Sequence, residues 1–230
     1  MAIEAVIFDM DGLMFDTERL SVRTWRHVLA ERGLTLTDEQ NQRLVGRNEE
    51  TGNRVLVELY GDAIGDVKQF RAHREEVRRQ WLERDGVDRK PGLLELLEFL
   101  REAGIPCAVA SSSAPHKIDY LLDRYELRKY FRAVVSGEDF AESKPHPAIF
   151  YKAVELLGVQ PAQALVLEDS PAGIEAAWRA GIPAVHIPDL IPPDETTRAH
   201  SWRQAENLLQ VVDIIRQANG MEREKSPKPL

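Results

Sequence analysis

Cysteine is almost absent from this chain of 230 residues, which contains Cys107 alone. A lone cysteine excludes an internal disulfide, and its place in an apolar run predicts a buried side chain in a reducing compartment. No apolar run approaches the ~20 residues that cross a bilayer. Glu4 and Asp9 fall where a signal peptide would have a basic start and a long apolar stretch. We therefore expect no signal peptide, no membrane partner and a cytoplasmic location.

Basic residues are outnumbered, with 30 Lys and Arg against 38 Asp and Glu and a formal net charge of -8. Such a chain would repel a nucleic-acid backbone, so we expect no nucleic-acid partner and a local site for any anionic ligand. The hydrophobic share of 43% suits one large domain or one domain with an insertion. No coiled-coil heptads are present, and a monomer is the default expectation.

Short apolar runs rich in Val, Ile and Ala recur along the chain and predict buried parallel strands. They lie at residues 5–8, 105–110, 133–135, 164–167 and 183–187. The amphipathic stretches between them predict helices at 92–103, 115–127, 147–157 and 171–180. Gly104, Gly158 and Gly181 follow three of these helices and are expected to end them. The alternation predicts an α/β fold with a doubly wound parallel sheet.

One segment interrupts this alternation, because residues 17–87 have a helical pattern and no convincing strand. Trp25, Val28 and Leu29 would share one face there, and Phe70 and Val77 recur at helical spacing. We interpret the segment as a helical cap inserted into an α/β core of residues 1–16 and 88–220. Residues 221–230 are charged and lack apolar periodicity, which predicts a disordered tail.

The first predicted strand runs directly into two acidic residues, Asp9 and Asp11, followed by Gly12. The carboxyl ends of strands are where open α/β sheets bind ligands. In an extended segment, residues two apart point to the same side, so the two carboxylates would face one pocket. A divalent cation such as Mg²⁺ would offset their repulsion. The alternative is a solvated acidic turn, since Asp and Gly are common in turns.

Polar residues also follow three later strands. Ser111 and Ser112 precede a predicted helix, where they could bind an anion or simply cap the helix. Lys144 lies in a loop that Pro145 and Pro147 stiffen just before a predicted helix, in a position to bind phosphate, although a surface lysine is the ordinary interpretation. Glu168 and Asp169 end the fourth strand, and two acids there would be costly without a partner such as a shared metal.

The order strand-DxDGxxxD, strand-SSS, loop-SKP and strand-LEDS, with a helical insertion after the first strand, resembles the haloacid dehalogenase superfamily. The resemblance covers nearly all of residues 3–190, and the chain closely resembles the sugar-phosphatase and beta-phosphoglucomutase branch. It implies a Mg²⁺-dependent phosphatase for a small phosphorylated metabolite. Motif combinations of this kind depend on their structural context for confirmation.

The resemblance also implies roles for single residues. Asp9 would be the nucleophile, and Asp11 the general acid and base. Ser111 and Lys144 would hold the phosphoryl oxygens, with Ser112 beside them. Asp9, the backbone carbonyl of Asp11, Glu168 and Asp169 would bind Mg²⁺. In the cap, Gly46 and Arg47 resemble a family loop that contacts the rest of the substrate, although Arg47 is equally consistent with a solvated helix end.

Alternative functions remain at this point. A phosphomutase of the beta-phosphoglucomutase type would share every core residue, but its histidine just beyond the first motif is replaced here by the stretch Glu18-Arg19-Leu20-Ser21. A dehalogenase would not need Asp11, and a phosphonate hydrolase would need a cap lysine. A phospho-acceptor signalling module could combine similar residues on a similar sheet, because fold alone does not decide function. The insertion and Asp11 favour an enzyme.

Overall fold

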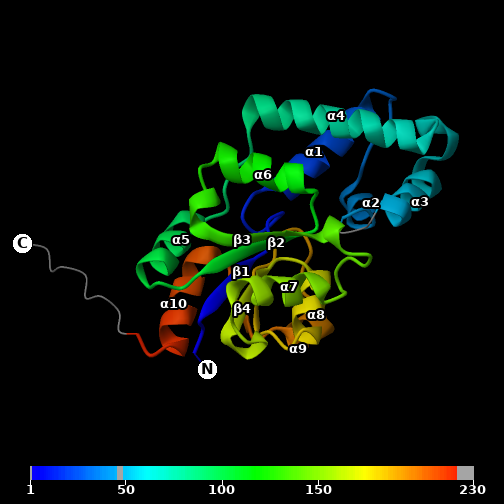
Figure 1. Cartoon of the computed structure of the whole chain (residues 1–230). Helices are drawn as coiled ribbons and strands as arrows, with labels where there is room; N and C mark the ends of the chain where they lie inside the picture. The colour runs from blue at the N-terminus through cyan, green and yellow to red at the C-terminus, as the bar shows by residue number, and fades with distance from the viewer. Residues whose placement is uncertain (1, 46–48, 222–230) are drawn as a thin grey trace, which may run out of the picture. The chain divides into compact units, whose positions relative to one another are not determined.

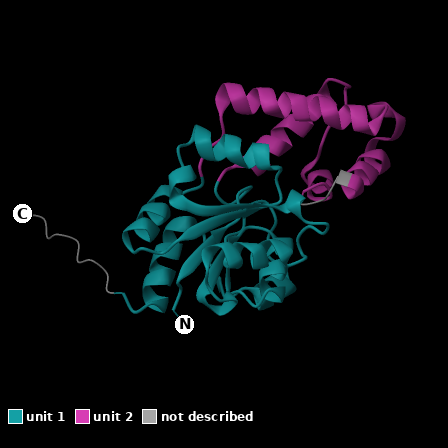
Figure 2. Cartoon of the chain, in the orientation of Figure 1, with its two compact units in different colours: residues 1–14, 90–230 teal, residues 15–89 magenta. Residues whose placement is uncertain are grey.

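The structure of the chain is a computed structural model that describes residues 2–45 and 49–221. The chain forms two compact units, each with its own core (Figure 2). Unit 1 contains residues 1–14 and 90–230, and unit 2 contains residues 15–89. Of the tail expected at 221–230, residues 222–230 lie outside the described residues.

Unit 1 is built on a six-stranded sheet in the order β3-β2-β1-β4-β5-β6, with every adjacent pair parallel (Figure 1). The strands are β1 (Ala5–Phe8), β2 (Cys107–Ser111), β3 (Phe131–Ser136), β4 (Ala164–Glu168), β5 (Ala184–His186) and β6 (Arg203–Gln204). The predicted parallel α/β sheet is confirmed. The sixth strand was not predicted, because β6 has two exposed residues and no apolar run.

Helices cover both faces of this sheet. Their bounds are α5 (Leu93–Glu102), α6 (Pro115–Arg124), α7 (Ala148–Leu157), α8 (Pro171–Arg179), α9 (Glu195–His200) and α10 (Leu208–Ala218). Alternate residues of a strand point to opposite faces, and Ala5 and Ile7 of β1 pack in one cluster with α7 and α8. Figure 1 shows α5, α6 and α10 on the other face. Burying the aliphatic residues of this core contributes about 1.5–3 kcal/mol per large side chain.

The predicted helix ends need one correction. The helix expected at 115–127 ends at Arg124, because Glu126 adopts a left-handed conformation with φ 56° and the Leu127 amide donates back to the Leu122 carbonyl. The three glycine stops are confirmed, with φ of 66°, 75° and 70° at Gly104, Gly158 and Gly181. Cys107 is buried as expected, and its thiol donates to the Tyr130 carbonyl at 3.0 Å.

Unit 2 is helical, as its sequence pattern predicts. Its helices are α1 (Thr17–Ala30), α2 (Asp38–Gln42), α3 (Glu49–Tyr60) and α4 (Val67–Asp85), with a short 3₁₀ helix at Gly61–Ile64. Trp25, Val28, Leu29 and Phe70 form a buried cluster with Val77. Thr37 caps α2 by accepting from the Gln40 amide, while the Gln40 side chain accepts from the Thr37 amide. Such a capping box satisfies two amides that a helix start leaves free.

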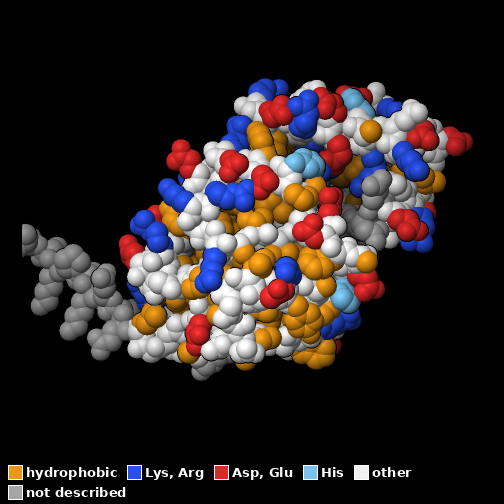
Figure 3. Space-filling view, in the orientation of Figure 1, with side chains coloured by type: hydrophobic (Ala, Val, Ile, Leu, Met, Phe, Trp, Pro, Cys, Tyr) orange, Lys and Arg blue, Asp and Glu red, His pale blue; other side chains and the backbone are white. Residues whose placement is uncertain are grey.

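Acidic and basic side chains are interspersed over the face seen in Figure 3. In the described part of the chain, no helix combines the length and the apolar character that crossing a bilayer requires.

Candidate active site

The candidate site lies within unit 1, at the carboxyl edge of its three central strands. β1 pairs with β2 on one side and with β4 on the other, in parallel. All three strands therefore end at the same edge. Asp9 and Asp11 follow β1, Ser111 is the last residue of β2, and Glu168 is the last residue of β4, with Asp169 next.

Lys144 connects two of these strand ends, although it comes from the loop before α7. Its Nζ lies 2.6 Å from Asp9 Oδ1 and 2.6 Å from Glu168 Oε1, and it donates to the Ala110 carbonyl at 3.1 Å. The Lys144 side chain is only 6% exposed. Burial opposes its charge, but the Asp9 and Glu168 carboxylates together raise the pKa of Lys144 above its usual value. Lys144 is thus a fixed cation at the site.

The Asp9 carboxylate is held in place and nearly enclosed. Its backbone amide donates to the Leu167 carbonyl at 3.0 Å, which ties the end of β1 to β4. Burial raises the pKa of Asp9 to about 8 against the opposing charge of Lys144, and the Glu168 carboxylate adds to the rise. A buried carboxylate with a raised pKa is stabilised in its charged form by any further cation placed beside it.

Asp11 has different partners from Asp9. Its Oδ2 accepts from the Ser113 hydroxyl at 2.7 Å and from the Ser111 hydroxyl at 3.3 Å. The Ser111 hydroxyl also accepts from the Ser113 amide at 3.0 Å. The two carboxylates that follow β1 therefore have different surroundings, because Lys144 lies beside Asp9 and serine hydroxyls lie beside Asp11. A pair of carboxylates in unlike surroundings can take different roles in acid-base chemistry.

Glu168 is fully buried and is oriented by the start of α8. Its Oε2 accepts from the Ser170 amide at 3.0 Å and from the Ser170 hydroxyl at 2.9 Å, while Oε1 faces Lys144. Gly173 in the first turn of α8 leaves the room for this side chain, since an added Cβ would lie 1.8 Å from Glu168 Oε1. Only glycine fits at position 173, because the Glu168 carboxylate approaches the backbone of α8 closely.

Asp9, Glu168 and Asp169 have the geometry of a metal site. One carboxylate oxygen from each lies within 4.8 Å of the others. Oxygen ligands of this kind suit Mg²⁺. Gly12, with φ 84°, keeps the chain clear of this cluster, because an added Cβ would lie 2.3 Å from Asp169 Oδ2. The donor set and its packing fit a hard divalent cation, which would offset the negative charge of the carboxylates that Lys144 does not balance.

Replacing Gly173 with alanine is expected to lower the free energy of unfolding by about 1–3 kcal/mol, the usual cost of overpacking, and to weaken Mg²⁺ binding. The added methyl group would displace the Glu168 carboxylate from Lys144 and Ser170. Denaturant unfolding and calorimetric Mg²⁺ titration measure the two effects. Adding Glu168→Asp shortens the side chain and is expected to recover part of the stability. A Gly173→Ala variant as stable as wild type would contradict this packing.

The structure thus brings together most of the predicted site residues: Asp9, Asp11, Ser111, Lys144, Glu168 and Asp169. Ser112 is exposed, with its backbone against Gly137, where an added Cβ would come within 3.0 Å of Ser112 Cα. Gly46 and Arg47 lie outside the described residues.

Two residues at the site were not predicted. Ser113 donates a hydrogen bond to Asp11. The run of three serines indicated that a hydroxyl would lie at the site, but it did not indicate which serine would contact Asp11. His186 is fully buried, and its Nε2 lies 3.0 Å from the Asp169 carbonyl oxygen. Because a carbonyl oxygen can only accept, Nε2 donates this hydrogen bond and holds the loop after β4, and burial lowers the pKa of His186. A histidine in an apolar strand gives no sequence signal for this contact.

A family model described as haloacid dehalogenase-like hydrolase matches residues 6–187. The phosphorylated carbohydrates phosphatase of Thermotoga maritima is 37% identical over 80% of this chain and 84% of its own length. The fructose-1-phosphate phosphatase of Escherichia coli is 34% identical over 79% and 95%. The beta-phosphoglucomutase of Bacillus subtilis is 33% identical over 80% and 83%.

The fold is also similar to solved structures. A crystal structure of CbbY from Rhodobacter sphaeroides in complex with phosphate has a TM-score of 0.75 and 25% identity. The match covers 91% of this chain and 96% of that one.

Proposed function

Since the chain belongs to the haloacid dehalogenase-like hydrolases, we propose that it is a magnesium-dependent phosphatase. It hydrolyses a small phosphorylated metabolite, such as a sugar phosphate, through an aspartyl-phosphate intermediate. The observation that carries the proposal is Lys144 Nζ at 2.6 Å from both Asp9 and Glu168, which form a cluster of three carboxylates with Asp169. Relatives named as phosphatases of phosphorylated carbohydrates and of fructose 1-phosphate support the substrate class.

The reaction has two steps. In the first, a carboxylate oxygen of Asp9 attacks phosphorus, the bond to the substrate oxygen breaks, and Asp11 gives its proton to that leaving oxygen. In the second, Asp11 takes a proton from water as the water attacks the same phosphorus, which releases phosphate and restores Asp9. The hydrogen bonds from Ser111 and Ser113 keep Asp11 oriented for both transfers.

Groups that are fixed in the site stabilise the negative charge of the transferring phosphoryl group. Lys144 and the Ser111 hydroxyl bind phosphoryl oxygens, with Ser112 beside them, so little reorganisation is needed during reaction. Asp9, Glu168, Asp169 and the backbone carbonyl of Asp11 would hold Mg²⁺. When bound, the metal supplies electrostatic stabilisation of the phosphoryl oxygens. Most of the catalysis therefore comes from positioning the reacting groups and from electrostatic stabilisation.

Two other functions lead to different results in the same assay. A phosphomutase would pass the phosphoryl group of Asp9 to a sugar instead of water, and a signalling module would retain it.

A cytoplasmic location, a monomeric state and the lack of nucleic-acid and membrane partners stay predictions from the sequence.

The proposal predicts metal-dependent multiple turnover of p-nitrophenyl phosphate. Treatment with EDTA is expected to remove the activity, and Mg²⁺ added in excess of EDTA is expected to restore it, because the carboxylate cluster needs the cation to accept a phosphate dianion. Release of p-nitrophenol measures this result. Parallel incubation with glucose 1-phosphate separates free phosphate, the expected product, from glucose 6-phosphate, which a mutase would make. A single burst without turnover, or full activity in EDTA, would reject the proposal.

A further inference from the structure

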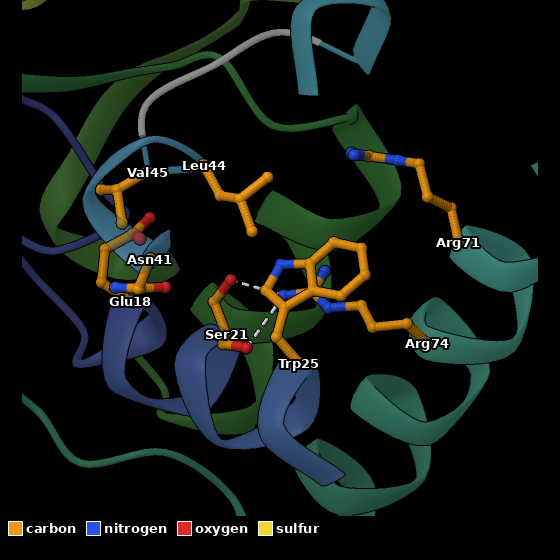
Figure 4. Close-up of a pocket in the computed structure, with 8 residues that line it drawn as sticks. All are labelled: Glu18, Ser21, Trp25, Asn41, Leu44, Val45, Arg71 and Arg74. Carbon is orange, nitrogen blue, oxygen red and sulfur yellow. Dashed lines mark hydrogen bonds between the residues drawn. The ribbon is translucent and has the colours of Figure 1, made fainter. Parts of the chain in front are cut away.

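Two side-chain nitrogens in the described part of the chain are buried without a hydrogen-bond partner, Nε of Arg74 in unit 2 and Nδ1 of His186 in unit 1. Arg74 has other partners, the Ser21 hydroxyl and the Glu75 carboxylate, and it lines a cavity of about 200 Å³, as Figure 4 shows. The His186 ring makes a single hydrogen bond among the described residues, from Nε2 to the Asp169 carbonyl at 3.0 Å. Burying a polar ring for one contact is costly, so that contact requires an explanation.

His186 lies where the carboxylate cluster joins the sheet. It is paired with Glu168 in the parallel register of β4 and β5, and the Ile187 amide donates to the Glu168 carbonyl at 2.8 Å. Asp169 is the first residue after β4. Nε2 of His186 donates to its carbonyl as a backbone amide would in a further rung of the sheet. The side chain therefore extends the pairing of β4 and β5 to the residue that supplies a carboxylate to the cluster.

The same loop is also fixed on the side of α8. The Ser170 amide and hydroxyl donate to Glu168 Oε2 at 3.0 and 2.9 Å, and the Ser170 hydroxyl accepts from the Gly173 amide at 3.1 Å. The main chain of Asp169 is thus held between the Ser170 contacts and the His186 ring. Because the carbonyl and the carboxylate belong to one residue, a shift of the Asp169 carbonyl also moves its carboxylate within the cluster.

Mg²⁺ and Ca²⁺ make different demands on the cluster of Asp9, Glu168 and Asp169. Mg²⁺ requires oxygens at about 2.1 Å in a nearly ideal octahedron, whereas Ca²⁺ takes longer distances in a flexible geometry. A carboxylate that is held in place for the smaller ion does not move outward for the larger one. We infer that His186 is a positioning residue, which through the Asp169 carbonyl sets the affinity of the cluster for Mg²⁺ and its preference for Mg²⁺ over Ca²⁺. The inference rests on the metal site of the proposed function.

His186→Met and His186→Gln test the inference as a matched pair. The two new side chains have nearly the same shape, but only glutamine has an NH₂ group that can replace the Nε2 donor. Calorimetric titration with Mg²⁺ and with Ca²⁺, without substrate, measures both affinities. His186→Met is expected to weaken Mg²⁺ binding by about tenfold or more, the usual loss when a residue that orients a metal ligand is removed. Its ratio of Mg²⁺ to Ca²⁺ affinity is expected to fall by a similar factor, and His186→Gln is expected to keep most of both.

Asn219→Ala is the control for a loss of stability alone. The Asn219 side chain donates to the Ile3 carbonyl at 2.9 Å and accepts from the Ile3 amide at 2.7 Å. These contacts lie just before β1, at the opposite end of the strand from the cluster. We expect this variant to unfold at a lower temperature and to keep the wild-type ratio of affinities. Because a general loosening of unit 1 would lower both affinities in proportion, the ratio separates positioning from stability.

An unchanged ratio in a folded His186→Met protein would overturn the inference, as would equal losses in His186→Met and His186→Gln. The wild-type protein offers a second test that does not depend on a variant folding. Of the six histidines, all of them described, His186 alone is buried. We expect its ring to show a slowly exchanging proton on Nε2 in ¹H–¹⁵N spectra, with a resonance that moves when Mg²⁺ is added.

A proton on Nδ1, or a resonance that Mg²⁺ leaves unmoved, would also overturn the inference. Wild-type protein that binds no Mg²⁺ in the calorimeter would reject the metal site of the proposed function and this inference with it. Wild-type binding together with an unchanged ratio in His186→Met would reject the role of His186 alone, so the two failures are distinguishable.

Discussion

Replacing Asp9 with asparagine is expected to reduce phosphatase turnover by about 10⁴-fold or more, the scale seen when other hydrolases lose a member of their nucleophilic group. The amide has the shape of the carboxylate but does not attack phosphorus. It also removes one of the two carboxylates at 2.6 Å from Lys144 Nζ. Steady-state release of p-nitrophenol in excess Mg²⁺ measures the loss.

A control measurement must show that the Asp9→Asn variant folds like wild type. Asp9 is nearly buried, and a near-isosteric change that removes its charge leaves the Leu167 hydrogen bond of its backbone in place. Circular dichroism and thermal unfolding should therefore match wild type closely. Turnover at the wild-type rate in a folded Asp9→Asn protein would reject Asp9 as the nucleophile.

The second large effect is expected for Asp11→Asn, and it should depend on the leaving group. Loss of a general acid and base costs about 10²–10⁴-fold, and an alkyl phosphate needs its leaving oxygen protonated. p-Nitrophenolate leaves without a proton, so the first step should continue and the second should stall. We expect a burst of p-nitrophenol followed by slow turnover, together with a much larger loss on glycerol 3-phosphate. Stopped-flow absorbance and phosphate release measure these two results.

Asp123→Asn is a suitable control, because Asp123 is exposed on α6 and lies away from the strand ends. It should show neither the burst nor the loss. Equal losses on both substrates in Asp11→Asn, with no burst, would contradict the assignment of Asp11 as the acid and base.

The sheet could be predicted from sequence because its strands are buried on both faces. Val6, Ile7 and Phe8 leave no exposed position in β1, so the whole run is apolar. Helix α10 was not assigned, although Leu208, Val211, Val212 and Ile215 are buried at helical spacing and give the signal. The two residues of β6 are exposed and give none.

At the candidate site, sequence order predicted which residues converge but not how they pair. Parallel strand ends must meet at one edge, and this rule alone brings Asp9 near Glu168 and Asp169. The bridge by Lys144 depends on a loop conformation, and the fit of Glu168 against Gly173 depends on side-chain packing. Neither property is contained in a local motif.

In the proposed reaction Asp9 carries the phosphoryl group, and locating that group on the protein is the decisive measurement. The Asp11→Asn protein, mixed with p-nitrophenyl phosphate and Mg²⁺ and quenched in acid during the slow phase, is digested and analysed by mass spectrometry. We expect the added mass of one phosphoryl group on the peptide that contains Asp9, and none in the protein that also carries Asp9→Asn. A phosphoryl group on any other residue, or its persistence without the Asp9 carboxylate, would rule out Asp9 as the residue that is phosphorylated.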